Sequence, residues 1–305
     1  MKVLITGGSG FIGSHIVEQL KRENYDLIIV DRNKSKQTYF EQQQIPYYAY
    51  DIHDKNLEYV FKQEKPDAII HLAAQISVPL SMKDPVLDMK VNGYGTIKLL
   101  KLATKYHVKK FIFASSAAVY GTPNYIPMDE THPVAPISFY GLSKAVGEQY
   151  IQMFQNIHDI DCCILRFANV YGPGQSVKGE AGVIAIFNHL MKQKLPLTIY
   201  GDGEQTRDFI YVKDIASACV ASLQLTGSHT INISSDTACS LNELIQHFIH
   251  LFNYSAVTKY LPANLGDIEH SRMTNNRART LLNWQPKYSM KLGLSEMYRY
   301  STLTN

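Results

Sequence analysis

The sequence predicts an α/β fold in which helices flank a doubly wound parallel sheet, with a smaller α/β domain on its C-terminal side. Two observations predict it. Short β-branched apolar runs alternate with stretches of helical period, and 305 residues exceed the usual size of one compact core. The expected strands are Val3–Thr6, Leu27–Val30, Tyr47–Tyr50, Ala68–His71, Lys110–Ser115 and Cys162–Arg166. The expected helices lie near Ser14–Glu23, Asn56–Gln63, Val91–Tyr106 and Tyr140–Ile157.

The alternation ends after Asn169, where the turn-rich sequence YGPGQSVKGEAG begins. We therefore expect one domain over residues 1–170 and a second over residues 171–305. Two later segments, Asp208–Val212 and Thr230–Ile233, again have the composition of strands, and either could return to the main sheet. The two domains are thus expected to be interleaved, with segments around residues 208–235 returning to the main one.

Composition excludes several classes of protein. Hydrophobic residues make up 45% and charged residues 19%, as in an ordinary folded protein. The formal charge of +3 is too balanced to indicate a nucleic-acid or membrane surface, although a small anionic ligand remains possible. No apolar run reaches the roughly 18 residues of a membrane span, and the N-terminus lacks the apolar core of a signal peptide, so we expect a cytoplasmic protein.

The four cysteines have no spacing typical of a metal site. We expect plain thiols in a reducing compartment, and no metal. They are Cys162, Cys163, Cys219 and Cys239.

Three glycines follow the first expected strand in the sequence GGSGFIG, where Gly7, Gly10 and Gly13 have the spacing G-x-x-G-x-x-G. Glycine lets the backbone approach a pyrophosphate closely, and the free N–H groups of the following helix stabilise its negative charge. Such a triplet also occurs in ordinary tight turns. The strand before it, the helix after it and an acid at the end of the next strand together indicate a dinucleotide site of the Rossmann type.

That acid is Asp31, which closes the run LIIVD. A carboxylate there accepts hydrogen bonds from the adenosine ribose and repels a 2′-phosphate, so NAD is favoured. Arg32 beside it leaves binding of NADP open, although this arginine could also be a solvated surface charge.

Asp51 could meet the adenine edge, and the segment His71–Gln75, HLAAQ, places small residues where the fourth strand passes the cofactor. Close packing would also explain the two alanines, and His71 could instead be a core histidine whose ring nitrogens are hydrogen-bonded within the protein.

Tyr140 and Lys144 form Y-x-x-x-K, so on a helix they project from the same face. A nearby ammonium stabilises a phenolate, which makes tyrosine a usable base near neutral pH. An amphipathic helix could carry this pair by chance in a chain with 20 tyrosines. However, Ser115 and Ser116 end the fifth strand, where doubly wound sheets bind ligands, and a hydroxyl there can bond the same substrate oxygen as the tyrosine.

With these motifs in place, the chain resembles the extended short-chain dehydrogenase/reductase family and, within it, the UDP-galactose (UDP-glucose) 4-epimerases. The resemblance covers nearly the whole length and follows the family's order of motifs. The matching segments are TGGSGFIGSH, HLAAQ, FASSAAVYG, YGLSK, LRFANVYGPG, GDGEQTRDFIYVKD and the closing GD…LNWQP.

This resemblance implies that Tyr140 exchanges a proton with the sugar 4-hydroxyl, that Ser116 hydrogen-bonds beside it, and that Lys144 holds the nicotinamide ribose. Hydride transfer to NAD would give a transient 4-keto sugar that is reduced again on its other face. The implied cofactor residues are Gly7, Gly10, Phe11, Ile12, Gly13, Asp31, Asp51, Ile52, Leu72, Ala73, Ala74, Asn92, Ser115, Tyr140, Lys144 and Phe167. The implied UDP-sugar residues are Ser77, Ser116, Tyr140, Asn169, Val183, Arg207, Asp267 and Ser271, with Arg207 on the diphosphate.

Two features distinguish this chain from related families. In dehydratases and decarboxylases, the motif at the end of this strand resembles T-D-E-V-Y-G or T-S-E-V-Y-G and supplies extra acid and base groups. This chain has Ala117 and Ala118 there, whose methyl groups cannot act as acid or base. A non-catalytic NAD-binding regulator would typically lack the Tyr140–Lys144 pair. A nucleotide-sugar reductase or dehydratase, and such a regulator, remain the alternatives to an epimerase.

The chain also departs from the epimerase pattern. Asn264 replaces the arginine usual just before the pair Gly266–Asp267, so a diphosphate contact is missing or comes from Lys178 or Arg272. Thr274 replaces an aspartate that commonly follows.

Ser271 occupies the position that sets the room beside the sugar's C2 substituent in this family, where a small residue is typical of enzymes that also accept N-acetylhexosamines. A surface serine without substrate contact is the alternative.

The resemblance further implies a homodimer that packs helices near Val91–Tyr106 and Tyr140–Ile157.

Overall fold

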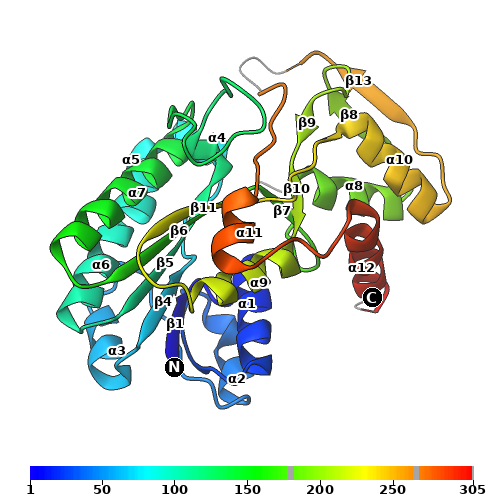
Figure 1. Ribbon diagram of the computed structural model, residues 1–305. Helices are drawn as coiled ribbons and strands as arrows, with labels where there is room; N and C mark the ends of the chain where they lie inside the picture. The colour runs from blue at the N-terminus through cyan, green and yellow to red at the C-terminus, as the bar shows by residue number, and fades with distance from the viewer. Residues whose placement is uncertain (178–181, 264–267, 304–305) are drawn as a thin grey trace.

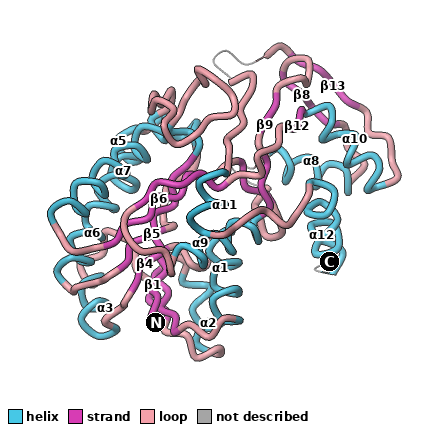
Figure 2. The backbone as a smooth tube through the Cα atoms, viewed as in Figure 1, coloured by secondary structure: helices cyan, strands magenta, loops and turns pink. Residues whose placement is uncertain are grey.

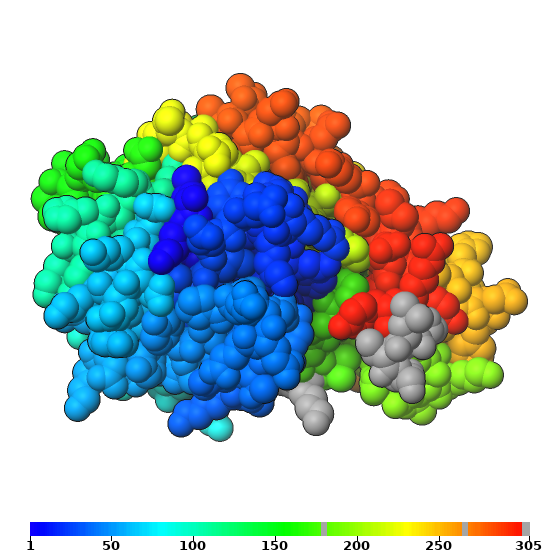
Figure 3. All heavy atoms as spheres, turned by 90° about the horizontal axis from the view of Figure 1, so that it is seen from below, coloured from blue at the N-terminus to red at the C-terminus, as the bar shows by residue number. Residues whose placement is uncertain are grey.

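The computed structural model describes residues 1–177, 182–263 and 268–303, with side chains described up to residue 300. Its elements form a large lobe around one parallel sheet and a smaller lobe beside it (Figure 1). Seen from below, N-terminal segments in blue cover the middle of the large lobe, and the C-terminal segments run from beside them, in orange, to the smaller lobe, in red (Figure 3).

Seven strands form the main sheet in the order β11-β6-β5-β4-β1-β2-β3, and every pair in it is parallel. The chain starts in the middle at β1, builds outward to β3, and returns to β4 on the other side. The carboxyl ends of β1 and β4 therefore form the switch point at which such sheets bind ligands. The bounds are β1 Lys2–Thr6, β2 Asp26–Val30, β3 Tyr47–Tyr48, β4 Ala68–His71, β5 Lys110–Ser116, β6 Asp161–Phe167 and β11 His229–Ile233.

Both faces of the sheet are buried, which explains why its strands are apolar at nearly every position. In β1, Val3 and Ile5 pack in one cluster with Leu20, whereas Leu4 points to the other face and packs with Phe61. Burial of one such side chain contributes about 1.5–3 kcal/mol. One face carries α1 Phe11–Arg22, α2 Gln37–Glu41, α9 Val212–Ser222 and α11 Asn276–Leu282, and the other α3 Leu57–Glu64, α6 Gly95–Lys105 and α7 Phe139–Ile157 (Figure 1).

Helix α7 begins where Ser138 caps it, because the Ser138 hydroxyl accepts a hydrogen bond of 3.1 Å from the N–H of Gly141. The cap fixes the first turn of the helix against the end of β5. Shorter elements that pack against α7 are α4 Val78–Lys83, α5 Pro85–Met89, the 3₁₀ turn Ala117–Val119 and the π-helical turn Lys90–Tyr94. Another 3₁₀ turn, Lys34–Lys36, precedes α2.

The smaller lobe has its own apolar cluster, in which Phe187, Leu197, Phe248 and Leu294 are buried. Three strand pairs lie around it: β8 with β13, β7 with β10, and β9 with β12. Figure 2 shows how short these strands are beside the helices of this lobe. The bounds are β7 Asn169–Tyr171, α8 Val183–Lys192, β8 Leu197–Tyr200, β9 Thr206–Arg207, β10 Phe209–Tyr211, β12 Cys239–Ser240, α10 Leu241–Phe252, β13 Thr258–Leu261 and α12 Met290–Leu303.

The two late strand segments go to different places. Thr230–Ile233 joins the main sheet as part of β11, beside β6. Asp208–Val212 gives β10, which pairs with β7 outside the main sheet. Ile210 packs in the cluster of the large lobe while Phe209 and Tyr211 pack in that of the smaller one, so β10 connects the two cores.

The fold class predicted from the sequence is confirmed, with two local differences. The third strand ends at Tyr48 rather than Tyr50. The helix expected over Val91–Tyr106 begins with the π-helical turn and becomes α-helical only at Gly95. The four cysteines are buried and free, and no helix among the described residues is long and apolar enough to cross a bilayer.

Candidate active site

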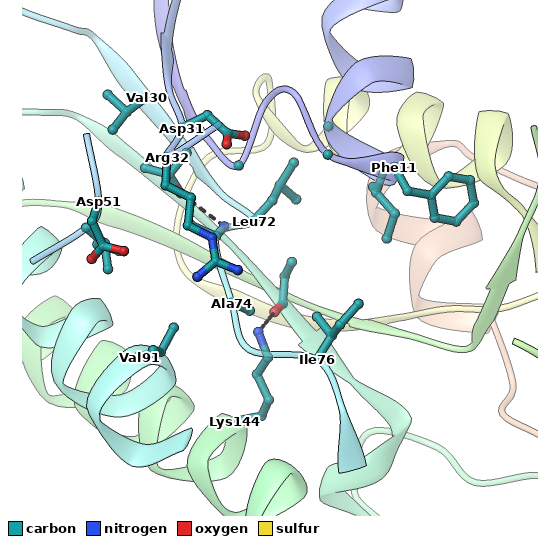
Figure 4. A pocket seen from close by; sticks show the side chains of 18 of the residues that line it. Phe11, Val30, Asp31, Arg32, Asp51, Leu72, Ala74, Ile76, Val91 and Lys144 are labelled. Carbon is teal, nitrogen blue, oxygen red and sulfur yellow. Dashed lines mark hydrogen bonds between the residues drawn. The ribbon is translucent and has the colours of Figure 1, made fainter. Parts of the chain in front are cut away.

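A cleft of about 310 Å³ opens at the carboxyl ends of β1, β2, β4 and β5 (Figure 4). It is lined by all the residues expected at the cofactor except Asn92. These are Gly7, Gly10, Phe11, Ile12, Gly13, Asp31, Asp51, Ile52, Leu72, Ala73, Ala74, Ser115, Tyr140, Lys144 and Phe167. The lining residues that sequence reasoning missed are Thr6, Val30, Tyr50, Ile76, Val91 and Ala114.

The signals for the missed residues differ. Val30 and Tyr50 each precede a predicted carboxylate, so counting back one residue from Asp31 and Asp51 would have found them. Val91 belongs to the π-helical turn, which the periodicity of the sequence did not reveal.

The glycine loop is as tight as its spacing predicts. Gly7 has φ of +72°, and a Cβ there would lie 2.9 Å from the backbone nitrogen of Ala73. A Cβ on Gly13 would lie 2.2 Å from the carbonyl oxygen of Gly7. Gly10, the N-cap of α1, offers no side-chain cap, so the first N–H groups of α1 are available to an anion such as a pyrophosphate.

Two carboxylates lie where the second and third strands end. The Asp31 carboxylate accepts hydrogen bonds of 3.0 Å from the N–H groups of Ser9 and Asn33, and Asp51 accepts one of 2.9 Å from the N–H of His53. Figure 4 shows Arg32 extending into the cleft between Asp51 and the glycine loop. Backbone contacts hold Asp31 in place, so its remaining lone pairs suit ribose hydroxyls.

Lys144 is buried on α7 and faces the end of β5. Its Nζ donates a hydrogen bond of 2.8 Å to the carbonyl of Ala114 and lies 6.0 Å from the ring centroid of Tyr140. Burial lowers the pKa of Lys144 to about 8, while the carboxylates of Asp88 and Glu148 act in the opposite direction. The lysine is therefore a cation that loses its proton only slightly above neutral pH.

Tyr140 as a whole is only partly buried, but burial of its hydroxyl raises its pKa. A hydrogen bond with Ser116 opposes this shift, and the Asp88 carboxylate adds to it. The expectation that Lys144 lowers the pKa of the Tyr140 phenol stays a prediction, because the shift in this structure arises from burial, Ser116 and Asp88. The Lys144 ammonium donates to the carbonyl of Ala114.

The adjacent serines have different partners. The Ser115 hydroxyl donates a hydrogen bond of 2.5 Å to Glu148, which also forms a buried ion pair with Arg166 at 2.6 Å. Ser116, by contrast, accepts from the N–H of Ala118 at 3.2 Å and interacts with Tyr140. Ser116 is therefore the serine whose hydroxyl lies beside that of Tyr140.

His71 is a satisfied core histidine, as one interpretation of the sequence had it. Its ring nitrogens pair with the hydroxyls of Thr6 at 2.8 Å and Thr96 at 3.1 Å. Burial, together with the nearby charge of Lys144, lowers the pKa of His71 to about 3, so the ring is neutral.

Asn92 lies behind the cleft and does not line it. Its amide oxygen accepts from the N–H of Gln75 at 2.9 Å, and its amide nitrogen donates to the carbonyl of Gln75, to Asp88 and to Ser143. These bonds use the hydrogen-bonding capacity of the amide inside the protein.

The expected UDP-sugar residues lie on separate segments beyond the cleft. Ser77 caps α4 by accepting from the N–H of Leu80, and Val183 begins α8. Asn169 is exposed on β7. Asp267 lies outside the described residues, as do Asn264 and Lys178.

Arg207 and Ser271, two of the expected UDP-sugar residues, lie close together in the structure. The Arg207 guanidinium donates to the carbonyl of Thr206 at 2.9 Å, and the N–H of Ser271 donates to the same carbonyl at 3.2 Å. Arg272, the other candidate for the missing diphosphate contact, forms an ion pair of 3.8 Å with Asp236.

Residues 3–234 match the family described as "NAD dependent epimerase/dehydratase family". The chain belongs to this family. The NAD cofactor and the assignment to an enzyme family, both predicted from the sequence, are therefore confirmed.

Relatives cover nearly the entire chain. A protein of Methanocaldococcus jannaschii, provisionally named UDP-glucose 4-epimerase, is 40% identical over 99% of both chains. The UDP-glucose 4-epimerase of Mycolicibacterium smegmatis is 36% identical over 98% of both.

Solved structures agree with this fold. UDP-glucose 4-epimerase of Thermotoga maritima with UDP-glucose has a TM-score of 0.95 and 36% identity, covering 100% of this chain and 99% of that one. The Thermus thermophilus enzyme with NAD has a TM-score of 0.91, 33% identity and 98% coverage of both. UDP-N-acetylglucosamine 4-epimerase of Methanobrevibacter ruminantium with UDP-N-acetylmuramic acid has a TM-score of 0.93, 32% identity and coverage of 100% and 99%. The chain is UDP-glucose 4-epimerase-like throughout its length.

Proposed function

We propose that the protein interconverts the C4 epimers of UDP-hexoses: UDP-Glc with UDP-Gal, and UDP-GlcNAc with UDP-GalNAc. The observation that carries this proposal is the Tyr140–Lys144 pair, with Ser116 beside it, at the inner end of a dinucleotide cleft. Relatives of 36–40% identity that span the chain and are named as UDP-glucose 4-epimerases support it.

The chain's own residues suit the required proton transfer. Tyr140 would take the proton from the sugar O4 and later return it, and Ser116 would hold the same oxygen by a hydrogen bond. Because burial raises the pKa of the free Tyr140 phenol, the base must gain stabilisation when the site fills. NAD, when bound, supplies a hydride acceptor and a positively charged ring. A transient 4-keto sugar is the intermediate that we propose.

The large lobe would hold the cofactor, and residues of both lobes would hold the UDP-sugar. The glycine loop and the Asp31 carboxylate would bind NAD, and Lys144 would donate to its nicotinamide ribose. Asn169, Val183, Arg207 and Ser271 would contact the UDP-sugar, together with Ser77. The proposed domains are residues 1–170, which include Ser77 and Asn169, and residues 171–305, with β11 returning to the main sheet.

Simple epimerisation is favoured over elimination because Ala117 and Ala118, after Ser116, carry no acid or base group. Ala117 and Ala118 form the 3₁₀ turn directly after Ser116. They supply no acid or base to deprotonate C5 or to protonate a leaving hydroxyl. A reductase or dehydratase would instead consume reduced cofactor or release water, and a regulator would do neither.

The small residue at Ser271 supports acceptance of N-acetylhexosamines. It lies on the segment that runs beside β9, next to Arg207, and its side chain is partly exposed. If Arg207 binds the diphosphate, Ser271 is within reach of the sugar. The UDP-N-acetylglucosamine 4-epimerase reported above, at 32% identity, supports this substrate class.

We also propose a homodimer in the cytoplasm. An exposed apolar stripe runs along the whole of α7, formed by Phe139, Leu142, Tyr150, Met153 and Ile157, which are 41–65% exposed. The spacing of three, eight, three and four residues keeps these side chains on one helix face. A second copy of the chain would bury this stripe, and light scattering should then give twice the mass of one chain.

The test of the activity is incubation of the purified protein with UDP-Glc, UDP-Gal, UDP-GlcNAc and UDP-GalNAc separately, with chromatographic separation of the epimers. Each sugar should give its C4 epimer without added oxidant. Net consumption of NADH, release of water from the sugar, or no conversion of any substrate would refute the proposal in favour of the corresponding alternative.

A further inference from the structure

A buried carboxylate, Asp88, lies close to the Tyr140–Lys144 pair and has no part in the function proposed above. Asp88 belongs to the short helix α5, which packs against α7, and is 1% exposed. Its Oδ1 accepts hydrogen bonds from the side-chain amides of Gln75 at 2.7 Å and Asn92 at 3.2 Å. Its Oδ2 is buried and has no hydrogen-bond partner among the described residues. A carboxylate in such a place requires compensation by positive charge.

The hydrogen bonds of Asp88 extend to the first turn of α7. Asn92 donates to the hydroxyl of Ser143 at 3.1 Å, and Ser143 donates to the carbonyl of Tyr140 at 3.0 Å. Gln75 lies between Ala74 and Ile76, which line the cleft. Asp88 thus holds both one wall of the cleft and the helix turn that carries the tyrosine.

Among the charged groups around the pair, Lys144 is the cation on which the charge of Asp88 acts. Arg166 is already neutralised by its buried ion pair with Glu148, and His71 is neutral. Among the groups that raise the pKa of Lys144 against the effect of burial, Asp88 is the largest and Glu148 the second. Asp88 also raises the pKa of Tyr140.

We propose that Asp88 is a positioning residue that fixes Asn92 and Gln75 against α7 and places one buried negative charge behind the Tyr140–Lys144 pair. This inference rests on the proposed function of that pair. Without the charge, Lys144 would lose its proton at a lower pH and would stop stabilising the Tyr140 phenolate at neutral pH. The catalytic base would then have neither a low pKa of its own nor a cationic partner.

The test compares Asp88→Asn with Asp84→Asn. Asp88→Asn removes the charge but keeps the shape and one acceptor oxygen. Asp84 is an exposed carboxylate that caps the same short helix by accepting from the N–H of Leu87, a bond that asparagine can replace. The titration of Lys144 is followed by NMR of protein labelled with ¹³Cε-lysine, and Lys144→Arg identifies its resonance.

In Asp88→Asn, the Lys144 titration should move to lower pH by about 1 unit, the usual scale for one opposite charge in a poorly solvated site. The alkaline limb of UDP-hexose turnover should move with it. Asp84→Asn should leave both at their wild-type positions. An unchanged Lys144 titration in folded Asp88→Asn, or an equal shift in Asp84→Asn, would overturn the proposal.

Two further variants keep the test decisive. If Asp88→Asn fails to fold, Asp88→Ser removes the same charge with a smaller side chain and should give the same shift. Gln75→Leu removes a hydrogen bond from Asp88 but no charge, so turnover should fall while the Lys144 titration stays near its wild-type pH. A shift in Gln75→Leu as large as in Asp88→Asn would contradict the role of the charge. The NMR titration needs no turnover, so it remains readable even if the UDP-hexose assay fails.

Discussion

Replacement of Gly13 by alanine tests whether the glycine loop is as constrained as its geometry indicates. The added Cβ would lie 2.2 Å from the carbonyl oxygen of Gly7, 2.7 Å from the Cα of Gly8 and 2.9 Å from its carbonyl carbon. All three atoms belong to the backbone, so no side chain can rotate away. The loop or the start of α1 must move by about 1.2 Å to reach the 3.4 Å at which ordinary contact begins.

The size of the effect follows from two opposing contributions. Overpacking against backbone should cost about 3 kcal/mol, the upper end of the usual range. Alanine in a helix gains about 1 kcal/mol over glycine, which leaves a net loss of about 2 kcal/mol. For a chain of this size, that lowers the melting temperature by about 3 °C. Bound NAD needs the native loop, so its affinity should fall by about 30-fold.

The assay is denaturant unfolding of protein stripped of cofactor, followed by calorimetric titration with NAD. Gly10→Ala is the matched control for unfolding, because its Cβ would meet only the Gly7 carbonyl oxygen, at 3.2 Å. It should change the free energy of unfolding by only about 0.5 kcal/mol through the loss of a preferred N-cap residue. If Gly13→Ala unfolds at the same denaturant concentration as wild type, the glycine loop can accept a Cβ at residue 13 without loss of stability, and the prediction is refuted.

Three further predictions concern the proposed chemistry. The purified protein should carry NAD or NADH without addition, since a cofactor reset in every cycle has no need to leave; denaturing release and chromatography measure this, and NADP alone would contradict the role of Asp31. Tyr140→Phe should lower turnover by about 10²–10⁴-fold while UDP-sugar affinity stays largely intact, and turnover at the wild-type rate would exclude the tyrosine as base. Ser271→Tyr should selectively suppress the UDP-GlcNAc/UDP-GalNAc pair, because overlap with the acetamido group costs about 1–3 kcal/mol. Equal loss of turnover on both substrate pairs, or no loss on either, would refute the proposal that Ser271 leaves room for the C2 substituent.

The sequence was sufficient wherever a feature depends on neighbours along the chain. The strands from Val3–Thr6 to Cys162–Arg166 were placed to within two residues, because a strand buried on both faces needs a continuous apolar run. The glycine loop and the Tyr140–Lys144 pair were identified for a related reason. A tight turn and a helix face are set by fixed local spacings, which are visible without any tertiary contact.

Asn92 and β10 show where local patterns stop being informative. The sequence placed Asn92 at the cofactor, but in the folded chain its amide is fully used by Gln75, Asp88 and Ser143, from three separate segments. The apolar run Asp208–Val212 predicted a strand correctly but not its partner. Pairing depends on which cores its side chains enter, and β10 contributes to both.

By itself, the sequence determined the fold class and predicted the dinucleotide cleft and the pair of residues proposed to react. Only the tertiary structure decided the ionisation of that pair. Burial raises the pKa of Tyr140 and lowers that of Lys144, and Asp88 opposes the effect on the lysine from a different helix. The free energy of a charge in the protein interior depends on every group packed around it, and these groups come together only when distant segments of the chain fold against each other.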